Sequence, residues 1–319
     1  MKKLFFAFGC LYFLSANIAA GVNLQSSSSA MSLKYEWLDS AFFYKKYNYR
    51  FAAKYQFFDK PLVVLDSSSS NELNSYIDRM QTIALSFSKR VNKKWSVAAS
   101  LPLSSVQMTG LEPQLGMGDI VLQGKYLVSQ RGKKLAFALL PQLELPTGDD
   151  RLFLSNTSVG VGVKAVVETH LKKFILAANW GYMYRNNATQ FGIDLRHQLP
   201  IGLGAVYTVN PRLSVSSELI GVVAASNESF RMPMELYLGS KWKTNPYMQL
   251  SAGVSIRGVD DANYGHLRVV AGIEFYPSFF SSKQIDHVTV TSASALTEKK
   301  CEAILKSHSD LFGSHNKKQ

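Results

Sequence analysis

The sequence predicts an all-β fold, a transmembrane antiparallel β-barrel of about 12 strands. Three features predict it: alternating apolar and polar residues, the length of the alternating segments, and the order of short and long connections. In the stretch YMQLSAGVSIRG (247–258), every second residue is apolar. Because successive side chains of a strand point to opposite faces, this segment has one apolar face and one polar face.

Segments of this kind are long and even in number. A strand of a soluble domain usually has about 5–6 residues, whereas about ten tilted residues cross the apolar band of an outer membrane. Twelve segments of ten or more residues recur, at 49–58, 80–90, 95–104, 119–129, 134–145, 158–168, 173–183, 198–208, 212–222, 232–243, 247–257 and 267–276. Their length favours a membrane barrel over a soluble sheet.

The connections between these segments alternate in length. Short ones follow the even-numbered segments, at 91–94, 130–133, 170–172, 210–212 and 244–246. Long ones follow the odd-numbered segments, at 59–79, 105–118, 146–157, 184–197, 223–231 and 258–266. Membrane barrels show this asymmetry between periplasmic turns and extracellular loops, whereas a Greek-key sandwich has no reason to sort its connections. Both ends of the barrel chain are therefore expected on the periplasmic side.

Aromatic residues fall where such a barrel meets lipid headgroups. At the expected periplasmic rim are Tyr49, Trp95, Tyr126, Tyr207, Trp242, Tyr247 and Phe275. At the opposite rim are Phe57, Trp180 and Tyr182. Ordinary core aromatics would instead be scattered along the middles of the strands.

The chain begins with the pattern of a secretory signal peptide. Residues 1–20 carry two lysines, a short apolar run and small residues before the expected cleavage point. Elsewhere no apolar run reaches the about 18 residues that a transmembrane helix needs. The expected organisation is a signal peptide (1–20), an N-terminal periplasmic segment or plug (21–47), the barrel (48–277) and a polar periplasmic tail (278–319). The bacterial outer membrane is the expected location.

Charge and cysteine content restrict the partners. The formal net charge is +12, but the Lys and Arg residues are scattered, and no nucleic-acid-binding motif is present. We attribute the charge to solubility and to contact with outer-membrane lipid, and expect no nucleic-acid partner. After removal of the signal peptide Cys301 is the one cysteine left, so no intramolecular disulfide can form.

Strand parity places a set of charged side chains in the lumen. Eight are basic and six acidic: Arg50, Lys54, Arg90, Lys125, Lys164, Lys241, Arg257 and Arg268, with Asp119, Glu144, Glu168, Glu218, Glu235 and Glu274. In an interior of low dielectric constant such charges must pair or stay hydrated. Paired charges would close a structural barrel, whereas hydrated charges would line a channel. The sequence leaves both alternatives open.

No residues are expected to form a catalytic, cofactor or metal site. His197 stands in RHQLP, without the serine of the HxSNG motif of twelve-stranded outer-membrane phospholipases. The pairs Asp149–Asp150 and Asp260–Asp261 lack the repeated acidic spacing of a dedicated calcium site, and the nearby His266 is interpreted as a polar loop residue. We therefore expect that the protein is not an enzyme.

Four stretches resemble a known group of proteins. They are YQFFDKPLVVLD (55–66), SVAASLPLSSVQMTG (96–110), MGDIVLQGKYLV (117–128) and LLPQLELPTGDD (139–150). In this order they are similar to bacterial OmpA-family proteins whose barrel is related to the transporter family of the phenol-degradation meta-pathway. The resemblance covers about 48–277 and implies an outer-membrane barrel and, for the transporter relatives, passage of small organic compounds. Only 43 residues follow Tyr276, too few for the peptidoglycan-binding domain of OmpA relatives.

Two functions follow from these observations. One is a channel for passive transport of small solutes, whether hydrophobic or not; the other is an OmpA-like scaffold with a closed lumen. Small inward residues favour the channel because they leave room in the lumen, unless residues 31–47 fold in as a plug: Ala98, Ser100, Ala138, Gly160, Gly162, Gly202, Gly204, Ser216, Gly239, Gly253 and Gly272.

Overall fold

The computed structural model describes most of the expected barrel and part of the segment before it. The described residues are 32, 34–43, 48–65, 73–132, 134–186, 189–190, 193–194, 196–225, 230–231, 234–258 and 266–277. The expected signal peptide and the tail with Cys301 lie outside them. Among the described residues, no helix has the length and hydropathy needed to cross a membrane.

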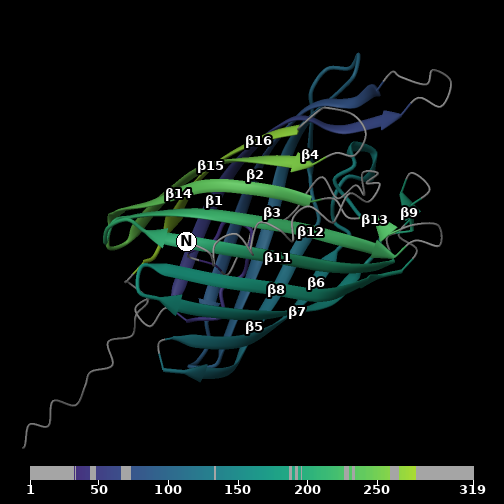
Figure 1. Ribbon diagram of the computed structural model, residues 1–319. Helices are drawn as coiled ribbons and strands as arrows, with labels where there is room; N and C mark the ends of the chain where they lie inside the picture. Colours follow the sequence, from purple (N-terminus) through teal and green to yellow (C-terminus); the bar gives the residue numbers. More distant parts are fainter. Residues whose placement is uncertain are drawn as a thin grey trace, which may run out of the picture. The chain divides into compact units, whose positions relative to one another are not determined.

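Twelve long antiparallel strands form a closed barrel, which confirms the predicted fold (Figure 1). They are β1 (Tyr49–Leu65), β2 (Leu73–Arg90), β3 (Trp95–Met108), β5 (Ile120–Arg131), β6 (Leu135–Leu145), β7 (Gly160–Leu171), β8 (Phe174–Arg185), β11 (His197–Thr208), β12 (Leu213–Ala225), β14 (Met234–Asn245), β15 (Met248–Gly258) and β16 (His266–Phe275). Each pairs with the next along the chain, and β1 pairs with β16. Closure leaves none of these strands with an unpaired edge, as a lipid environment requires.

The connections at the two ends of the barrel differ. Turns at 91–94, 132–134, 172–173, 209–212 and 246–247 define the short-turn end. The connections at the other end, the long-loop end, contain β4 (Gln114–Met117), the 3-10 helix η2 (Asp150–Leu152), β9 (Thr189–Gln190), β10 (Ile193–Asp194) and β13 (Phe230–Arg231). Short and long connections therefore alternate around the barrel.

The prediction of a long loop at 59–79 is wrong, because β1 extends to Leu65 and β2 begins at Leu73. The β1–β2 register shifts just after Asp59, and Lys60 has a positive φ of 45°. Pro61 follows and has no N–H to donate to the ladder. This bulge interrupts the alternation of side chains, so the pattern ends before the strand does.

The two faces of the wall differ in character. In β15, Val254 and Ile256 are exposed on the outside, whereas Ser251 and Ser255 are buried. Aromatic rings pack across the outer surface near the short-turn end, where the ring centroids of Trp95 and Tyr126 are 4.8 Å apart. The outer surface is thus apolar and the inner one polar.

Candidate functional site: the lumen and the N-terminal segment

The main feature of the lumen is a stretch of chain that precedes the barrel. We call residues 32 and 34–43 the N-terminal segment. Six of its residues have no exposed surface: Ser32, Tyr35, Glu36, Asp39, Ser40 and Ala41. It contacts side chains of both β5 and β14, which stand six places apart among the twelve barrel strands. The segment therefore crosses the lumen from one wall to the opposite one.

One buried carboxylate on β12 holds the first turn of the segment. Glu218 Oε1 accepts the N–H of Glu36 at 2.6 Å. Its Oε2 accepts the N–H groups of Trp37 and Leu38 at 2.8 and 3.0 Å. Three successive backbone N–H groups thus converge on one anion, an arrangement in which each hydrogen bond is charge-assisted.

A second buried carboxylate, on β7, holds the next turn in the same way. Glu168 Oε2 accepts the Ser40 hydroxyl at 2.5 Å, the Ala41 N–H at 2.9 Å and the Phe42 N–H at 3.4 Å. His170 Nε2 lies 2.7 Å from the other oxygen of Glu168. The two glutamates therefore anchor the two ends of the segment to different walls.

The acidic side chains of the segment pair with lysines of the wall. Glu36 lies 2.8 Å from Lys54 Nζ and 3.5 Å from Lys241 Nζ. Asp39 lies 2.5 Å from Lys164 Nζ. Burial alone would raise the pKa of Glu36, but the charges of Lys54 and Lys241 outweigh it and lower that pKa. Glu36 is therefore held in its charged form.

Lysine ammonium groups also bind backbone carbonyls of the segment. Lys125 Nζ donates to the carbonyls of Ser40 and Phe42 at 2.9 and 3.3 Å. Lys241 Nζ donates to the carbonyl of Tyr35 at 2.8 Å. Backbone groups that a strand would satisfy in a ladder are here satisfied by wall side chains.

Small residues of the wall make room for the apolar side chains of the segment. A Cβ at Gly202 would overlap Leu38, and one at Gly204 would overlap Leu38 and approach Tyr35. Space beside Gly239 is filled by the Tyr237 side chain of the wall itself. The expectation that small inward residues leave open room is therefore wrong at Gly239, while at Gly202 and Gly204 the N-terminal segment takes the room, which is the exception that the sequence allowed. Their sequence pattern does not show what occupies the space.

An arginine of the wall stacks on an aromatic ring of the segment. The Arg268 guanidinium carbon lies 4.6 Å from the ring centroid of Trp37 and 4.0 Å from that of Phe58. Such cation–π contacts contribute about 0.5–2 kcal/mol, more where water is excluded. The same arginine pairs with Glu235 at 3.2 Å.

Other charges predicted for the lumen form ion pairs with residues of the wall. Arg50 pairs with Glu274 at 3.0 Å, and Glu144 pairs with Arg185 at 2.5 Å. Arg185, which the sequence pattern missed, lies two residues beyond the expected end of its strand at 183.

The remaining predicted residues lie near the ends of the barrel. Asp119 accepts the N–H groups of Gly148 and Asn156 at 3.0 and 2.8 Å, so it holds a connection at the long-loop end. Arg90 ends β2 at the short-turn end, with its guanidinium 5.4 Å from the Phe43 ring centroid. The side chain of Arg257 lies outside the described part of the chain.

Sequence reasoning also missed the carboxylates that the segment itself brings. The charges predicted for the lumen include two more cations than carboxylates. Glu36 and Asp39 are two carboxylates, and the structure buries both beside wall lysines. The excess of two cations in the sequence could therefore have indicated that two further carboxylates lie in the lumen.

Groups considered for chemistry have structural partners. Asp149 accepts the N–H of Arg151 at 3.0 Å at the start of η2, and His197 Nδ1 lies 2.7 Å from the Tyr182 hydroxyl. Within the described ranges, no three His, Cys, Asp or Glu side chains gather where they could hold a metal ion. Asp260 and Asp261 lie outside those ranges.

The chain is similar to solved structures of outer-membrane proteins. The COG4313 outer membrane channel from Pseudomonas putida F1 is similar, with 13% identity, a TM-score of 0.55 and coverage of 72% of this chain and 95% of that chain. The KdgM porin in complex with disordered oligogalacturonate aligns at 10% identity and a TM-score of 0.47, over 71% of this chain and 98% of that chain. The first likeness shows the fold of an outer-membrane β-barrel.

Sequence comparison identifies the family. A comparison with curated proteins finds no match. The profile of the family described as "Putative MetA-pathway of phenol degradation" matches residues 97–266, more than half of the 319-residue chain. This confirms the phenol-degradation part of the resemblance, while the OmpA-family part stays a prediction. The chain therefore belongs to the family of the MetA-pathway of phenol degradation.

Proposed function

We propose that this protein is an outer-membrane channel for passive passage of small solutes, and that the N-terminal segment is a plug that closes its lumen. The observation that carries the proposal is that a separate stretch of chain lies buried in the lumen among the side chains of the wall. A barrel that serves only as a scaffold needs no such space. Twelve strands enclose more room than an eight-stranded barrel, whose own side chains fill its interior.

The chemistry of the plug contacts supports a lumen that opens. Most of these contacts are charge-assisted hydrogen bonds and ion pairs, such as those of Glu168, Glu218 and Lys125. Water can replace such partners once the segment leaves, whereas an apolar wall would resist hydration. The same side chains then become a hydrated, mixed-charge lining. The paired and hydrated alternatives are thus two states of one lumen.

Location, partners and solutes follow from the same proposal. The apolar outer face contacts outer-membrane lipid, with the short-turn end on the periplasmic side. Family membership supports small organic compounds as the solutes, and hydrophobic ones among them. The protein acts as a channel and not as an enzyme. The OmpA-like scaffold remains the alternative if the lumen never conducts.

Conductance in planar bilayers tests the proposal. The full chain is compared with a chain lacking residues 31–47, each checked for folding by its heat-modifiable migration on a gel. We expect rare openings from the full chain and sustained current from the shortened one. Silence from both folded proteins would defeat the channel and leave the scaffold.

A further inference from the structure

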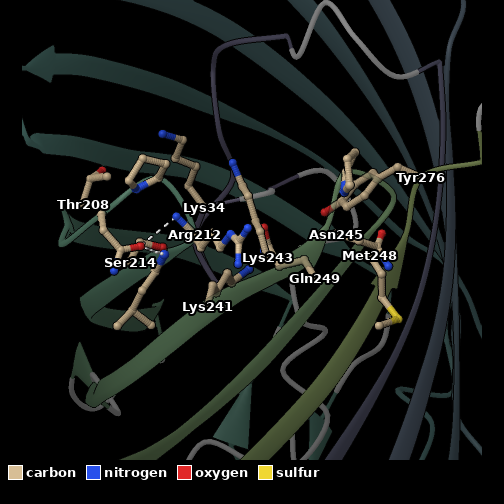
Figure 2. A pocket seen from close by; sticks show the side chains of 14 residues that line it. Lys34, Thr208, Arg212, Ser214, Lys241, Lys243, Asn245, Met248, Gln249 and Tyr276 are labelled. Carbon is tan, nitrogen blue, oxygen red and sulfur yellow. Dashed lines mark hydrogen bonds between the residues drawn. The ribbon is translucent and has the colours of Figure 1, made fainter.

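The short-turn end of the lumen holds a pocket with a basic lining (Figure 2). Its volume is about 130 Å³, and the turns 209–212 and 246–247 contribute to its rim. Four cationic side chains line it: Lys34, Arg212, Lys241 and Lys243. No aspartate or glutamate is among its lining residues.

The cations come from three separate parts of the chain. Lys241 and Lys243 are two residues apart on β14, which places both side chains on the inner face. Arg212 ends the turn before β12, and Lys34 comes from the N-terminal segment. A backbone hydrogen bond of 2.8 Å from Lys243 N–H to the Arg212 carbonyl joins the two wall elements.

Local hydrogen bonds fix the two turns that carry these groups. Asn210 Oδ1 accepts the N–H groups of Arg212 and Leu213, both at 2.8 Å. Asn245 Oδ1 accepts the N–H of Tyr247 at 2.8 Å. The rim is therefore built on a rigid backbone.

The positive charge of the pocket is only partly compensated. Lys241 pairs with Glu274 at 3.3 Å and with Glu36 at 3.5 Å. Across the part of the chain that the structure describes, the other three cations form no ion pair with a carboxylate. Burial lowers the pKa of the Lys34 ammonium group. The negative charge of Glu168 raises this pKa, and the positive charge of Lys243 lowers it. Like charges in a half-closed space repel unless an anion joins them.

We infer that this pocket binds a small oxyanion from solution, a phosphate or a carboxylate. A guanidinium donates two parallel N–H bonds to such a group, and lysines add point charges around it. The pocket volume suits one phosphate or one small carboxylic acid. The inference does not rest on conduction, because the pocket exists with the segment docked. In a conducting barrel the pocket would attract anionic solutes at the short-turn end.

Isothermal titration calorimetry of the full chain in a nonionic detergent tests this inference. The probes are sodium phosphate and sodium benzoate at constant ionic strength. The Arg212→Gln/Lys243→Gln double variant removes two cations of the pocket. Its control, Lys93→Gln/Lys94→Gln, removes two exposed cations from another turn at the same end. Heat-modifiable migration on a gel shows that each variant is folded.

We expect the parent chain and the control to bind at least one of the two anions. The double variant should bind that anion at least about tenfold more weakly, because it loses charge-assisted hydrogen bonds to the anion. Two outcomes would overturn the inference: the parent chain could bind neither anion, or the control could lose as much affinity as the double variant. If a parent chain that binds neither free anion binds phosphatidylglycerol in nanodiscs, the pocket belongs to a lipid headgroup instead.

Discussion

Replacing Glu218 with glutamine is expected to loosen the N-terminal segment while keeping the shape of the wall. The carboxylate accepts three N–H groups, from Glu36 at 2.6 Å, Trp37 at 2.8 Å and Leu38 at 3.0 Å. Glutamine has the same shape but a single acceptor oxygen and no charge. If the glutamine oxygen accepts the N–H groups of Trp37 and Leu38, the glutamine NH₂ group faces the N–H of Glu36. Two donors then face each other, and one hydrogen bond is lost.

The size of the effect follows from this lost acceptor. One hydrogen bond to a charged group contributes about 1.5–3 kcal/mol, and about 1.4 kcal/mol corresponds to a tenfold change in an equilibrium. The ratio of released to docked segment should therefore rise by roughly 10- to 150-fold. The two remaining hydrogen bonds no longer go to a charged group, so a roughly tenfold rise in the ratio is the smallest that we expect.

Single-channel recording gives this ratio as the open time divided by the closed time, because the channel is open when the segment is released and closed when it is docked. The fraction of time that the channel is open rises with this ratio. The matched control is Glu144→Gln, the same substitution at a buried lumen carboxylate that pairs with Arg185 of the wall. We expect Glu218→Gln to raise the open fraction and Glu144→Gln to leave it unchanged. The reasoning would be refuted by an unchanged open fraction in Glu218→Gln, or by an equal rise in the control.

Three further outcomes are expected. Gly202→Val places atoms where Leu38 lies, so it should raise the open fraction of a barrel that still folds; a channel as closed as the parent would contradict this. Docking lowers the pKa of Glu36, so the stabilisation from this group is complete above its ordinary pKa of about 4.3 and is lost as the pH falls further; acid should therefore raise the open fraction reversibly, and an open fraction that stays constant below about pH 4 would contradict this. Protease added to intact cells should cut the connection between β1 and β2 and spare the turn at 246–247, whereas cleavage confined to the short turns would reverse the orientation.

The strands and the inward charges follow from local sequence because the geometry of a strand is local. Alternation puts Lys54 and Glu168 on the polar face of their strands, the barrel interpretation turns that face inward, and the structure buries both. The pattern fails where the backbone departs from a regular strand. The bulge at Lys60 and Pro61 hides the last residues of β1, up to Leu65.

The position of the N-terminal segment has no comparable local signal. Glu36 and Glu218 are 182 residues apart in the sequence, and their contact depends on closure of the whole barrel. The segment itself shows neither strand nor helix periodicity. Its backbone groups form hydrogen bonds with side chains of the wall, and no local pattern in the sequence indicates such partners. Sequence therefore leaves open whether the lumen is filled, and by what.

A reversible tether between the segment and the wall tests the central claim most directly. The Leu38 side chain packs on Gly204 of the wall, and a Cβ at Gly204 would overlap it. The substitutions Leu38→Cys and Gly204→Cys therefore place two thiols within disulfide reach. In a chain without the predicted signal peptide (1–20), Cys301→Ser leaves this pair as the only cysteines. The Glu218→Gln background supplies frequent openings. Bilayer conductance is recorded before and after addition of a reductant. If the segment is the plug, the oxidised protein stays closed and current appears on reduction, whereas equal current in both states would show that solutes pass with the segment in place.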